Sequence, residues 1–408
     1  MTVVQFMLDG LREMFRGSRE YWMWLGALAV VVAFGAWNYS QQLTNGLVVT
    51  GMSDQVSWGF YISNFAFLVG IAAAAVLLVI PAYIFDRKDI KDVVLVGEGM
   101  AVAAVTMAIL FVIVDLGRPD RLWHMLPGIG RFHWPVSLLA WDVLVLSVYF
   151  LLNLAIPFYV LYSRYRGKEP IFRRYFPFVV IAMFWAISIH TVTAFLFSAN
   201  PARPFWHTSL LGPRFIASAF ASGPALIIIA LQIIRKVTSY HISQTVIDTL
   251  AIIMTFALQI SLFFVGVELF TDFYNEGAHA ASIHYLFFGL GGFNSLQMWI
   301  WCALALNLIA VVILMIHPLR RNTLMLNIAC VLAFIGIWIE KGMGLVIPGF
   351  IPTPLGEIFE YMPTSVELSV AAGIWAFGIL VFTLLAKAVI AIEQGRLHYR
   401  ARGERYSS

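Results

Sequence analysis

Long apolar stretches separated by short polar ones dominate this chain. Each stretch holds about 20 or more predominantly apolar residues, the length with which a helix crosses a hydrocarbon core of ~30 Å. The sequence lacks the alternating segments of about ten residues that are typical of membrane β-barrels. We therefore predict an all-α polytopic membrane protein with about ten transmembrane helices. The predicted spans are 21–40, 57–85, 93–115, 135–162, 174–198, 213–234, 246–272, 296–316, 323–345 and 367–391.

Composition excludes a soluble domain and narrows the possible chemistry. Hydrophobic residues make up 61% of the chain and charged residues 12%, whereas a soluble domain has roughly 25% charged residues. No basic stripe suited to nucleic acid is present. The two cysteines, Cys302 and Cys330, each lie inside an apolar run, so this chain cannot build a cysteine-ligated cluster. Any iron–sulfur chemistry is expected to come from a partner.

The distribution of Lys and Arg predicts the orientation in the membrane. Nineteen of these residues fall in the segments on one side of the predicted spans, and five fall on the other side. Positive residues in short loops are retained in the cytoplasm, so we expect both termini to be cytoplasmic in a bacterial inner membrane. The outer side carries Arg118, Arg121, Arg131, Arg203 and Arg214. Its loops are long and rich in Gly, Pro, His and aromatic residues, which favours function on the outer face.

A weak internal repeat suggests two similar halves. SLLAW at 137–141 in the fourth span resembles SLQMW at 295–299 in the eighth, and Ile189-His190 in the fifth parallels Ile339-Glu340 in the ninth. Chance similarity between apolar helices is the alternative. The repeat predicts two four-helix bundles with two flanking helices. The expected segments are an interfacial segment at 1–20, the first helix and its loop at 21–56, bundles at 57–200 and 201–345, and the last helix with a basic tail at 346–408.

Ionisable residues inside predicted spans are candidates for function, because such groups are costly at membrane depth. Most of them fall in the outer halves of their spans, and Glu98 clearly belongs to an inner half. His190 lies near the middle of the fifth span, where it is a proton relay, a structural hydrogen bonder or a haem ligand. A haem needs a second histidine at matching depth, so we expect none. Glu340, next to Lys341, is either a proton-transfer group or part of an internal ion pair.

The richest polar segment is DLGRPDRLWHMLPGIGRFHWPVSLLAWD, at 115–142. A lipid-soluble quinone needs an apolar slot, donors to its carbonyl groups, and a His or carboxylate that exchanges protons. We predict that His133 and Asp142 fill this catalytic role, with Trp134 beside them. Asp115 and Arg118 are either quinone-binding residues or a structural ion pair.

The same residues carry a resemblance to a known family. DLGRPDR, VSWGFYISNFAFLVGIAAAA, FLFSANPARPFWHT and PRFIASAFASGPA resemble the NrfD/PsrC family of membrane quinone-interacting subunits. The length resembles the ten-helix branch of QrcD, DsrP, HmcC and alternative complex III type. The resemblance implies a menaquinone or ubiquinone site near the outer face of the first bundle, lined by Trp58 and Asn64. It also implies an extracytoplasmic ferredoxin-like iron–sulfur subunit, with a molybdopterin-family subunit or a multihaem cytochrome beyond it.

Two further expectations concern protons and alternative functions. A proton route across the membrane needs a continuous series of protonatable or hydroxyl groups. On the cytoplasmic side of His190 the first bundle offers mainly Glu98, Thr106 and Ser147, which are too few for a complete route. We therefore expect quinone protons to be exchanged near the outer side. A secondary transporter or proton channel is the first alternative, although helix breaks are expected in one half only, at Gly342 and Gly344. The second alternative is a purely structural membrane anchor.

Overall fold

The computed structural model describes residues 2–126, 128–275, 277 and 280–399. Within these residues it is helical, with ten helices or helix pairs long and apolar enough to cross a membrane. The all-α polytopic prediction is thus confirmed. The helices are α1 (Thr2–Met14), α2 (Arg19–Asn45), α3 (Phe60–Ala73), α4 (Val76–Tyr83), α5 (Lys88–Asp115), α6 (Leu138–Tyr165), α7 (Phe172–Ser198), α8 (Leu211–Val237), α9 (Gln244–Asn275), α10 (Ala280–Phe288), α11 (Gln297–Met315), α12 (His317–Arg321), α13 (Thr323–Lys341), α14 (Met343–Val346) and α15 (Ser365–Glu393).

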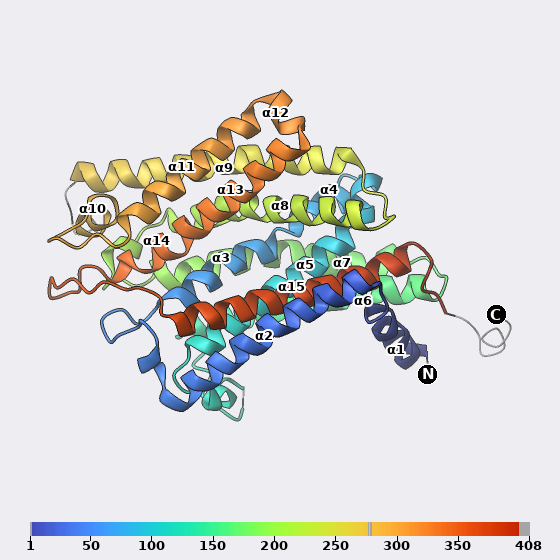
Figure 1. Cartoon of the computed structure of the whole chain (residues 1–408), viewed down its shortest axis with the longest axis horizontal. Coiled ribbons are helices and arrows are strands. Elements are labelled where there is room, and N and C mark those ends of the chain that lie inside the picture. Colours follow the sequence, from blue (N-terminus) through green and yellow to red (C-terminus); the bar gives the residue numbers. More distant parts are fainter. Residues whose placement is uncertain (1, 127, 276, 278–279, 400–408) are drawn as a thin grey trace.

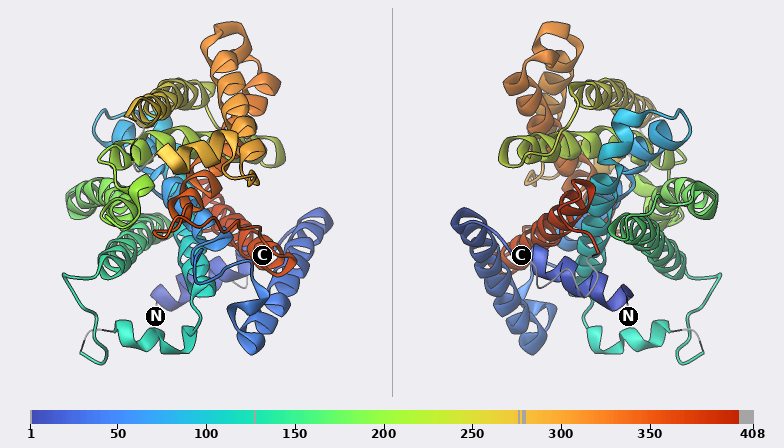
Figure 2. Two further views of the ribbon diagram at one scale, coloured as in Figure 1. Left: turned by 90° about the vertical axis from the view of Figure 1, so that its left-hand side faces the viewer. Right: turned by 90° about the vertical axis from the view of Figure 1, so that its right-hand side faces the viewer.

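The most buried spans are α3 with α4, α5 and α8, which form the centre of the molecule. Around them stand three pairs of packed helices: α2 with α15, α6 with α7, and α11 with α13 (Figure 2). α9 covers α8, and α8 contacts both α3 and α7. The first and last long helices therefore lie side by side although they are far apart in the sequence (Figure 1).

Two glycines allow α2 and α15 to cross closely. A Cβ atom on Gly35 would lie 2.7 Å from the Cα of Gly373, nearer than real Cβ contacts come. Small residues at such crossings let helix backbones approach each other in lipid. The contact attaches α2, most of whose surface is exposed, to the rest of the chain.

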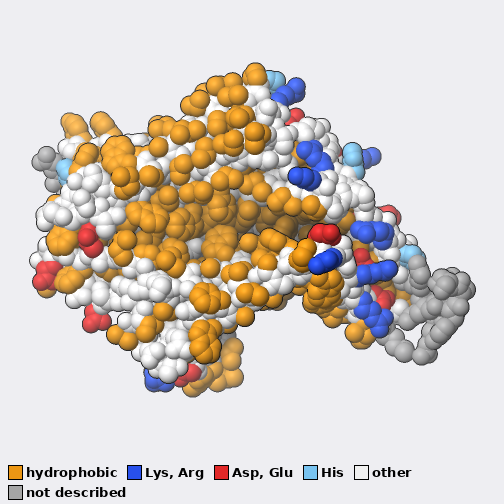
Figure 3. Space-filling view, viewed as in Figure 1, with side chains coloured by type: hydrophobic (Ala, Val, Ile, Leu, Met, Phe, Trp, Pro, Cys, Tyr) orange, Lys and Arg blue, Asp and Glu red, His pale blue; other side chains and the backbone are white. Residues whose placement is uncertain are grey.

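Basic side chains gather at one end of the molecule, where α1 and the end of α15 also lie (Figures 1 and 3). We call this end cytoplasmic and the opposite end outer, following the predicted orientation. α1 docks there through Phe6, which packs edge-on against Phe158 and Tyr165. The Tyr165 hydroxyl donates a 2.6 Å hydrogen bond to Asp9. Other apolar side chains of α1, such as Leu8, stay exposed.

The second span is not one continuous helix, so the expectation that breaks occur in one half only is wrong. At the junction of α3 and α4 the Ala74 amide bonds to the Ile71 carbonyl, and the Leu77 amide bonds to the Ala74 carbonyl. The break lies where α8 approaches, since a Cβ atom on Gly223 would lie 1.9 Å from that of Ala74. No proline marks the junction itself, so the apolar pattern alone did not reveal it. The expected break at Gly342, between α13 and α14, is present.

A buried carboxylate holds the outer ends of several helices together. Glu367, in the first turn of α15, accepts hydrogen bonds from the Tyr361 hydroxyl at 2.5 Å and the Gly51 amide at 2.7 Å. Thr364 completes a capping box with it. The Tyr361 oxygen in turn accepts the Phe60 amide at 2.8 Å. The start of α3 is thereby fixed against the start of α15.

Candidate functional site

Asp142 lies just over one turn into α6, on the buried side of that helix. Ser137 caps the helix, since its Oγ accepts the Ala140 amide at 3.4 Å. The Asp142 side chain is 4% exposed, and its Oδ1 accepts a 2.7 Å hydrogen bond from Thr193 Oγ1 on α7. Because a hydroxyl rather than a cation holds this carboxyl group, it is able to gain or lose a proton without breaking an ion pair.

His190 lies one turn before Thr193, so both side chains share a face of α7. The imidazole is buried, and neither ring nitrogen has a hydrogen-bond partner among the described residues. Buried polar groups are nearly always satisfied, so such a group calls for water or a ligand. Asp142 and Thr193 form a buried polar pair between α6 and α7, and His190 lies one turn earlier on α7. Sequence reasoning missed Thr193, whose only signal was its spacing from His190.

His133 and Trp134 lie on the outer loop before α6. His133 is exposed and has a left-handed backbone with φ +50°. Its carbonyl accepts the amides of Val136 and Ser137, both at 2.9 Å, which turns the chain into α6. Trp134 lies against Trp141, with 3.6 Å between ring centroids. Among the described residues no hydrogen bond joins the His133 side chain to Asp142, so their joint catalytic role stays a prediction.

Asp115 and Arg118 do not pair with each other, so the structural ion pair expected between them is wrong. Arg118 is exposed and reaches Asp120 instead, with Nε 3.0 Å from Oδ1 and Nη2 2.9 Å from Oδ2. Its guanidinium lowers the pKa of the Asp120 carboxyl. The Asp115 Oδ1 is buried without a hydrogen-bond partner in the part of the chain that the structure describes. The two residues face different surroundings because α5 ends at Asp115 and the chain then turns outward.

Trp58 belongs to an aromatic cluster at the outer end of the central helices. It stacks on Trp206, with 5.6 Å between ring centroids, and meets Phe197 and Phe350 edge-on. The Trp206 indole donates a 2.8 Å hydrogen bond to the Leu345 carbonyl. Trp58 therefore helps to join α7 to the segment after α13.

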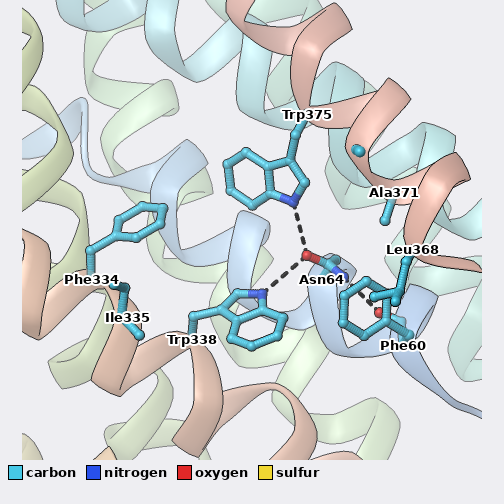
Figure 4. A pocket seen from close by; sticks show the side chains of 9 residues that line it. Phe60, Asn64, Phe334, Ile335, Trp338, Leu368, Ala371 and Trp375 are labelled. Atoms are coloured by element: carbon cyan, nitrogen blue, oxygen red, sulfur yellow. Dashed lines mark hydrogen bonds between the residues drawn. The ribbon is translucent and has the colours of Figure 1, made fainter. Parts of the chain in front are cut away.

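Asn64 lines a pocket of about 330 Å³ between α3, α13 and α15 (Figure 4). Its Oδ1 accepts the indole N–H groups of Trp338 at 3.0 Å and Trp375 at 2.9 Å. Its Nδ2 donates to the Phe60 carbonyl at 2.8 Å. The pocket is lined by Phe60, Asn64, Phe334, Ile335, Trp338, Leu368, Ala371, Ala372 and Trp375.

This pocket lies in the outer half of the molecule, because α3 and α15 begin there and α13 ends there. Ile335 and Leu368 are 41% and 48% exposed, so the pocket opens sideways. The surface between α13 and α15 is hollowed and almost entirely apolar (Figure 3). The sequence placed the site of Asn64 within the first bundle. Two of the three walls of this pocket come from α13 and α15, which lie outside the predicted first bundle.

A network of buried charges joins α8, α9 and α13. Arg214 pairs with Glu268 and with Glu340, whose Oε1 lies 3.0 Å from Nη2. Asn307 donates a 3.3 Å hydrogen bond to the other Glu340 oxygen. Lys341 instead lies over the Phe215 ring, 4.1 Å from its centroid. Glu340 is thus part of an internal ion pair, and Arg214, counted with the outer loops in the sequence, is a buried residue of α8.

Glu98, the candidate in the inner half, is buried on α5, and its Oε2 has no hydrogen-bond partner among the described residues. Within the described part of the chain, no group of three or more His, Cys, Asp or Glu side chains is arranged to hold a metal ion. Cys302 on α11 and Cys330 on α13 are both free.

Comparison with known proteins agrees with this architecture. The family model described as polysulphide reductase, NrfD, matches residues 48–352. A protein of Halobacterium salinarum named as a dimethyl sulfoxide reductase membrane subunit is 27% identical, over 88% of each chain. An Hdr-like menaquinol oxidoreductase integral membrane subunit of Archaeoglobus fulgidus is 25% identical, over 92% of this chain and 95% of that one. The integral membrane subunit of a menaquinone reductase from Nitratidesulfovibrio vulgaris is 22% identical, over 90% of each.

Proposed function

This chain belongs to the NrfD polysulphide reductase family, and we propose that it is the quinone-reactive membrane subunit of a respiratory oxidoreductase complex. In this proposal it spans a bacterial cytoplasmic membrane with both termini inside. It binds menaquinone or ubiquinone near the outer face and exchanges electrons with a partner. Relatives named as a menaquinol oxidoreductase subunit and a menaquinone reductase subunit support this choice of substrate.

The pocket around Asn64 is the observation that carries the proposal. A volume of about 330 Å³ lies in the range of small-molecule sites, which are mostly apolar with a few placed polar groups. The indoles of Trp338 and Trp375 and the ring of Phe60 offer flat faces to a planar quinone ring. The two indole N–H groups are able to donate hydrogen bonds to a quinone carbonyl in place of the Asn64 oxygen. The lateral opening lets a lipid-soluble molecule enter from the bilayer.

Proton exchange requires titratable groups, and the pocket lining contains none among its nine residues. We assign this task to Asp142, which Thr193 holds, and to His190 one turn from Thr193 on α7, with His133 on the outer loop before α6. All lie on the outer side of the bundle, where an extracytoplasmic partner docks. Asp115, with its unpartnered oxygen, is a further acceptor at the same end.

We propose that electrons are exchanged with a partner, because the chain's two cysteines, on different helices, cannot supply the ligands of an iron–sulfur cluster. We propose an extracytoplasmic ferredoxin-like iron–sulfur subunit over the outer loops. A molybdopterin-family subunit or a multihaem cytochrome would lie beyond it. The relatives' names, which include reductase membrane subunits, support an assembly of several chains.

The test compares variants of the pocket in the complex purified in mild detergent. Ala371→Phe fills the pocket and Asn64→Leu removes its amide, so both are expected to lose co-purifying quinone and to raise the KM for quinol. Trp37→Phe is the matched control, since Trp37 faces outward on α2 and is 66% exposed. Unchanged quinone content in both pocket variants, with correctly assembled complex, would refute the site. Transport of a solute or protons without quinone turnover would instead favour the transporter alternative.

A further inference from the structure

The chain makes a fixed corner between α1 and α2 at the cytoplasmic end. The Tyr21 hydroxyl donates a 2.7 Å hydrogen bond to the Met14 carbonyl at the end of α1. Ser18, the N-cap of α2, accepts the Tyr21 amide at 3.3 Å. A Cβ atom on Gly17 would lie 2.3 Å from Cδ1 of Tyr21, so the ring packs against the linking backbone. Because α1 and α2 both contact α15, the corner lies beside the end of α15 (Figure 1).

Lys387 places a positive charge beside this corner. Between Lys387 and Glu393, the last residue of α15, the helix rises about 9 Å. The Lys387 side chain is partly exposed, and its Nζ lies over the Tyr21 ring, 3.6 Å from the centroid. Among the residues that the structure describes, no carboxylate forms an ion pair with it. A lysine near the end of a membrane helix extends its flexible stem toward the lipid headgroups.

Two exposed arginines add to the positive charge around Lys387. Arg16 follows the end of α1, and Arg396 follows the end of α15. Both are near enough for their charges to act on Lys387, as is Glu13. Neither arginine has an ion-pair partner in the described part of the chain. Three cations therefore face one carboxylate, and the excess of positive charge attracts an anion.

An apolar strip continues from Lys387 toward the middle of the membrane. On α15, Lys387, Thr383 and Ile379 are spaced four residues apart, so they lie close together on one face. The Trp24 indole of α2 donates a 3.3 Å hydrogen bond to Thr383 Oγ1. Trp24 and Ile379 are both exposed. The seam between α2 and α15 thus has a positive end, then an aromatic ring, then an aliphatic surface.

The outward face of α1 indicates that lipid surrounds this corner. A stripe of half-exposed apolar side chains recurs along it every three or four residues, at Val4, Leu8, Leu11 and Phe15. Amphipathic helices of this kind lie in the membrane interface with the apolar face among the acyl chains. Phe15 also stacks on Trp22 at the start of α2, with 6.3 Å between ring centroids. Tryptophan is enriched at the level of the headgroups.

We propose that Lys387, Arg16 and Arg396 bind the phosphate of an anionic phospholipid in the cytoplasmic leaflet. The acyl chains follow the strip of Thr383, Trp24 and Ile379 along α15. Basic pockets between membrane helices on the cytoplasmic side bind lipid headgroups of this charge. The lipid bridges α1, α2 and α15 at the point where α2, the least buried of the described spans, begins. An acidic protein segment fits the charges but not the apolar surfaces beside them.

Native mass spectrometry of the full chain, purified in mild detergent, tests this site. Phosphatidylglycerol and phosphatidylcholine with identical acyl chains are titrated separately, and the Kd of the tightest site is measured. Wild-type protein is expected to prefer phosphatidylglycerol. Lys387→Gln with Arg16→Gln is expected to weaken phosphatidylglycerol binding roughly thirtyfold, from about fivefold for each charge near a lipid surface, and to leave phosphatidylcholine unchanged. Lys387→Arg keeps a cation over the Tyr21 ring, so it is expected to keep the wild-type affinity.

The matched control removes two other cytoplasmic charges. Arg173→Gln with Arg174→Gln changes exposed residues at the start of α7 and is expected to leave both Kd values unchanged. Equal affinity of the wild type for the two lipids would overturn the site, as would wild-type phosphatidylglycerol affinity in the variant lacking Lys387 and Arg16.

Two competitors distinguish the occupant. Inorganic phosphate carries the charge without acyl chains, and a polyglutamate peptide carries it on a protein chain. We expect neither to displace phosphatidylglycerol at equal concentration. Displacement by inorganic phosphate would overturn the role of the acyl chains, and displacement by the peptide would favour an acidic protein segment over lipid. Co-purifying quinone is expected to be the same in all these variants, so this inference stands or fails separately from the proposed function.

Discussion

The acceptor role of Asn64 leads to a quantitative prediction. Its Oδ1 joins two indole donors from helices that are distant in sequence, at 3.0 Å and 2.9 Å. Asn64→Leu keeps the side-chain volume similar but leaves the N–H groups of Trp338 and Trp375 without their acceptor. Hydrogen bonds between membrane helices contribute about 0.6 kcal/mol on average and up to about 1.7 kcal/mol. Two bonds therefore predict a coupling of about 1–3 kcal/mol.

A double-mutant cycle measures this coupling. Asn64→Leu is made in the wild type and in the Trp338→Phe, Trp375→Phe background, and unfolding in SDS is followed by circular dichroism. The asparagine substitution is expected to cost less in the double-Phe background, because the donors are already gone. In a Trp37→Phe background its cost is expected to be unchanged. If the free-energy cost of Asn64→Leu in the Trp338→Phe, Trp375→Phe background equals its cost in the wild type to within about 0.5 kcal/mol, the assignment is refuted.

Three further predictions follow from other contacts. Asp142→Asn is expected to lower quinol turnover by roughly 10²–10⁴-fold while bound quinone is retained, as measured by steady-state kinetics and quinone extraction. Arg214→Met strands two buried glutamates at a cost of about 3–5 kcal/mol, so the monodisperse fraction in gel filtration should collapse; the exposed Arg118→Met should leave it unchanged. Gly35→Leu overpacks the crossing with α15 by about 1–3 kcal/mol, and proteolysis should then release α2. Gly26→Leu, with open space around that position, is its control, and equal proteolysis of both would contradict the crossing.

The membrane spans were predictable because their signal is local. A long apolar stretch is more stable in lipid than in water, and a helix forms the hydrogen bonds of its own backbone within one segment. The ten predicted spans therefore correspond to the observed helices, although several ends differ. α5 starts at Lys88 rather than 93, and the short α10 lies inside a predicted outer loop. A helix of nine residues is too short for a hydropathy signal.

Candidate polar residues were also visible in the sequence, because a charge inside an apolar run stands out. Asp142, His190, Glu98 and Glu340 are all buried as that reasoning expects. Their partners were not visible. Thr193, Asn307 and Arg214 lie on other helices than the carboxylates they bind, and no pattern next to Asp142 or Glu340 marks them. The partner of Arg118 is close to it in the sequence. The structure pairs Arg118 with Asp120, two residues later, and not with Asp115, three residues earlier.

The sequence by itself determined how many helices cross the membrane, which residues are costly to bury, and on which end the basic residues gather. Hydropathy and charge act within a single segment, so they can be read along the chain. Only the tertiary structure decided which helices share a wall. The pocket of Asn64 arises where side chains from α3, α13 and α15 meet. Those meetings depend on close packing, such as Gly223 against Ala74, which one segment does not encode alone.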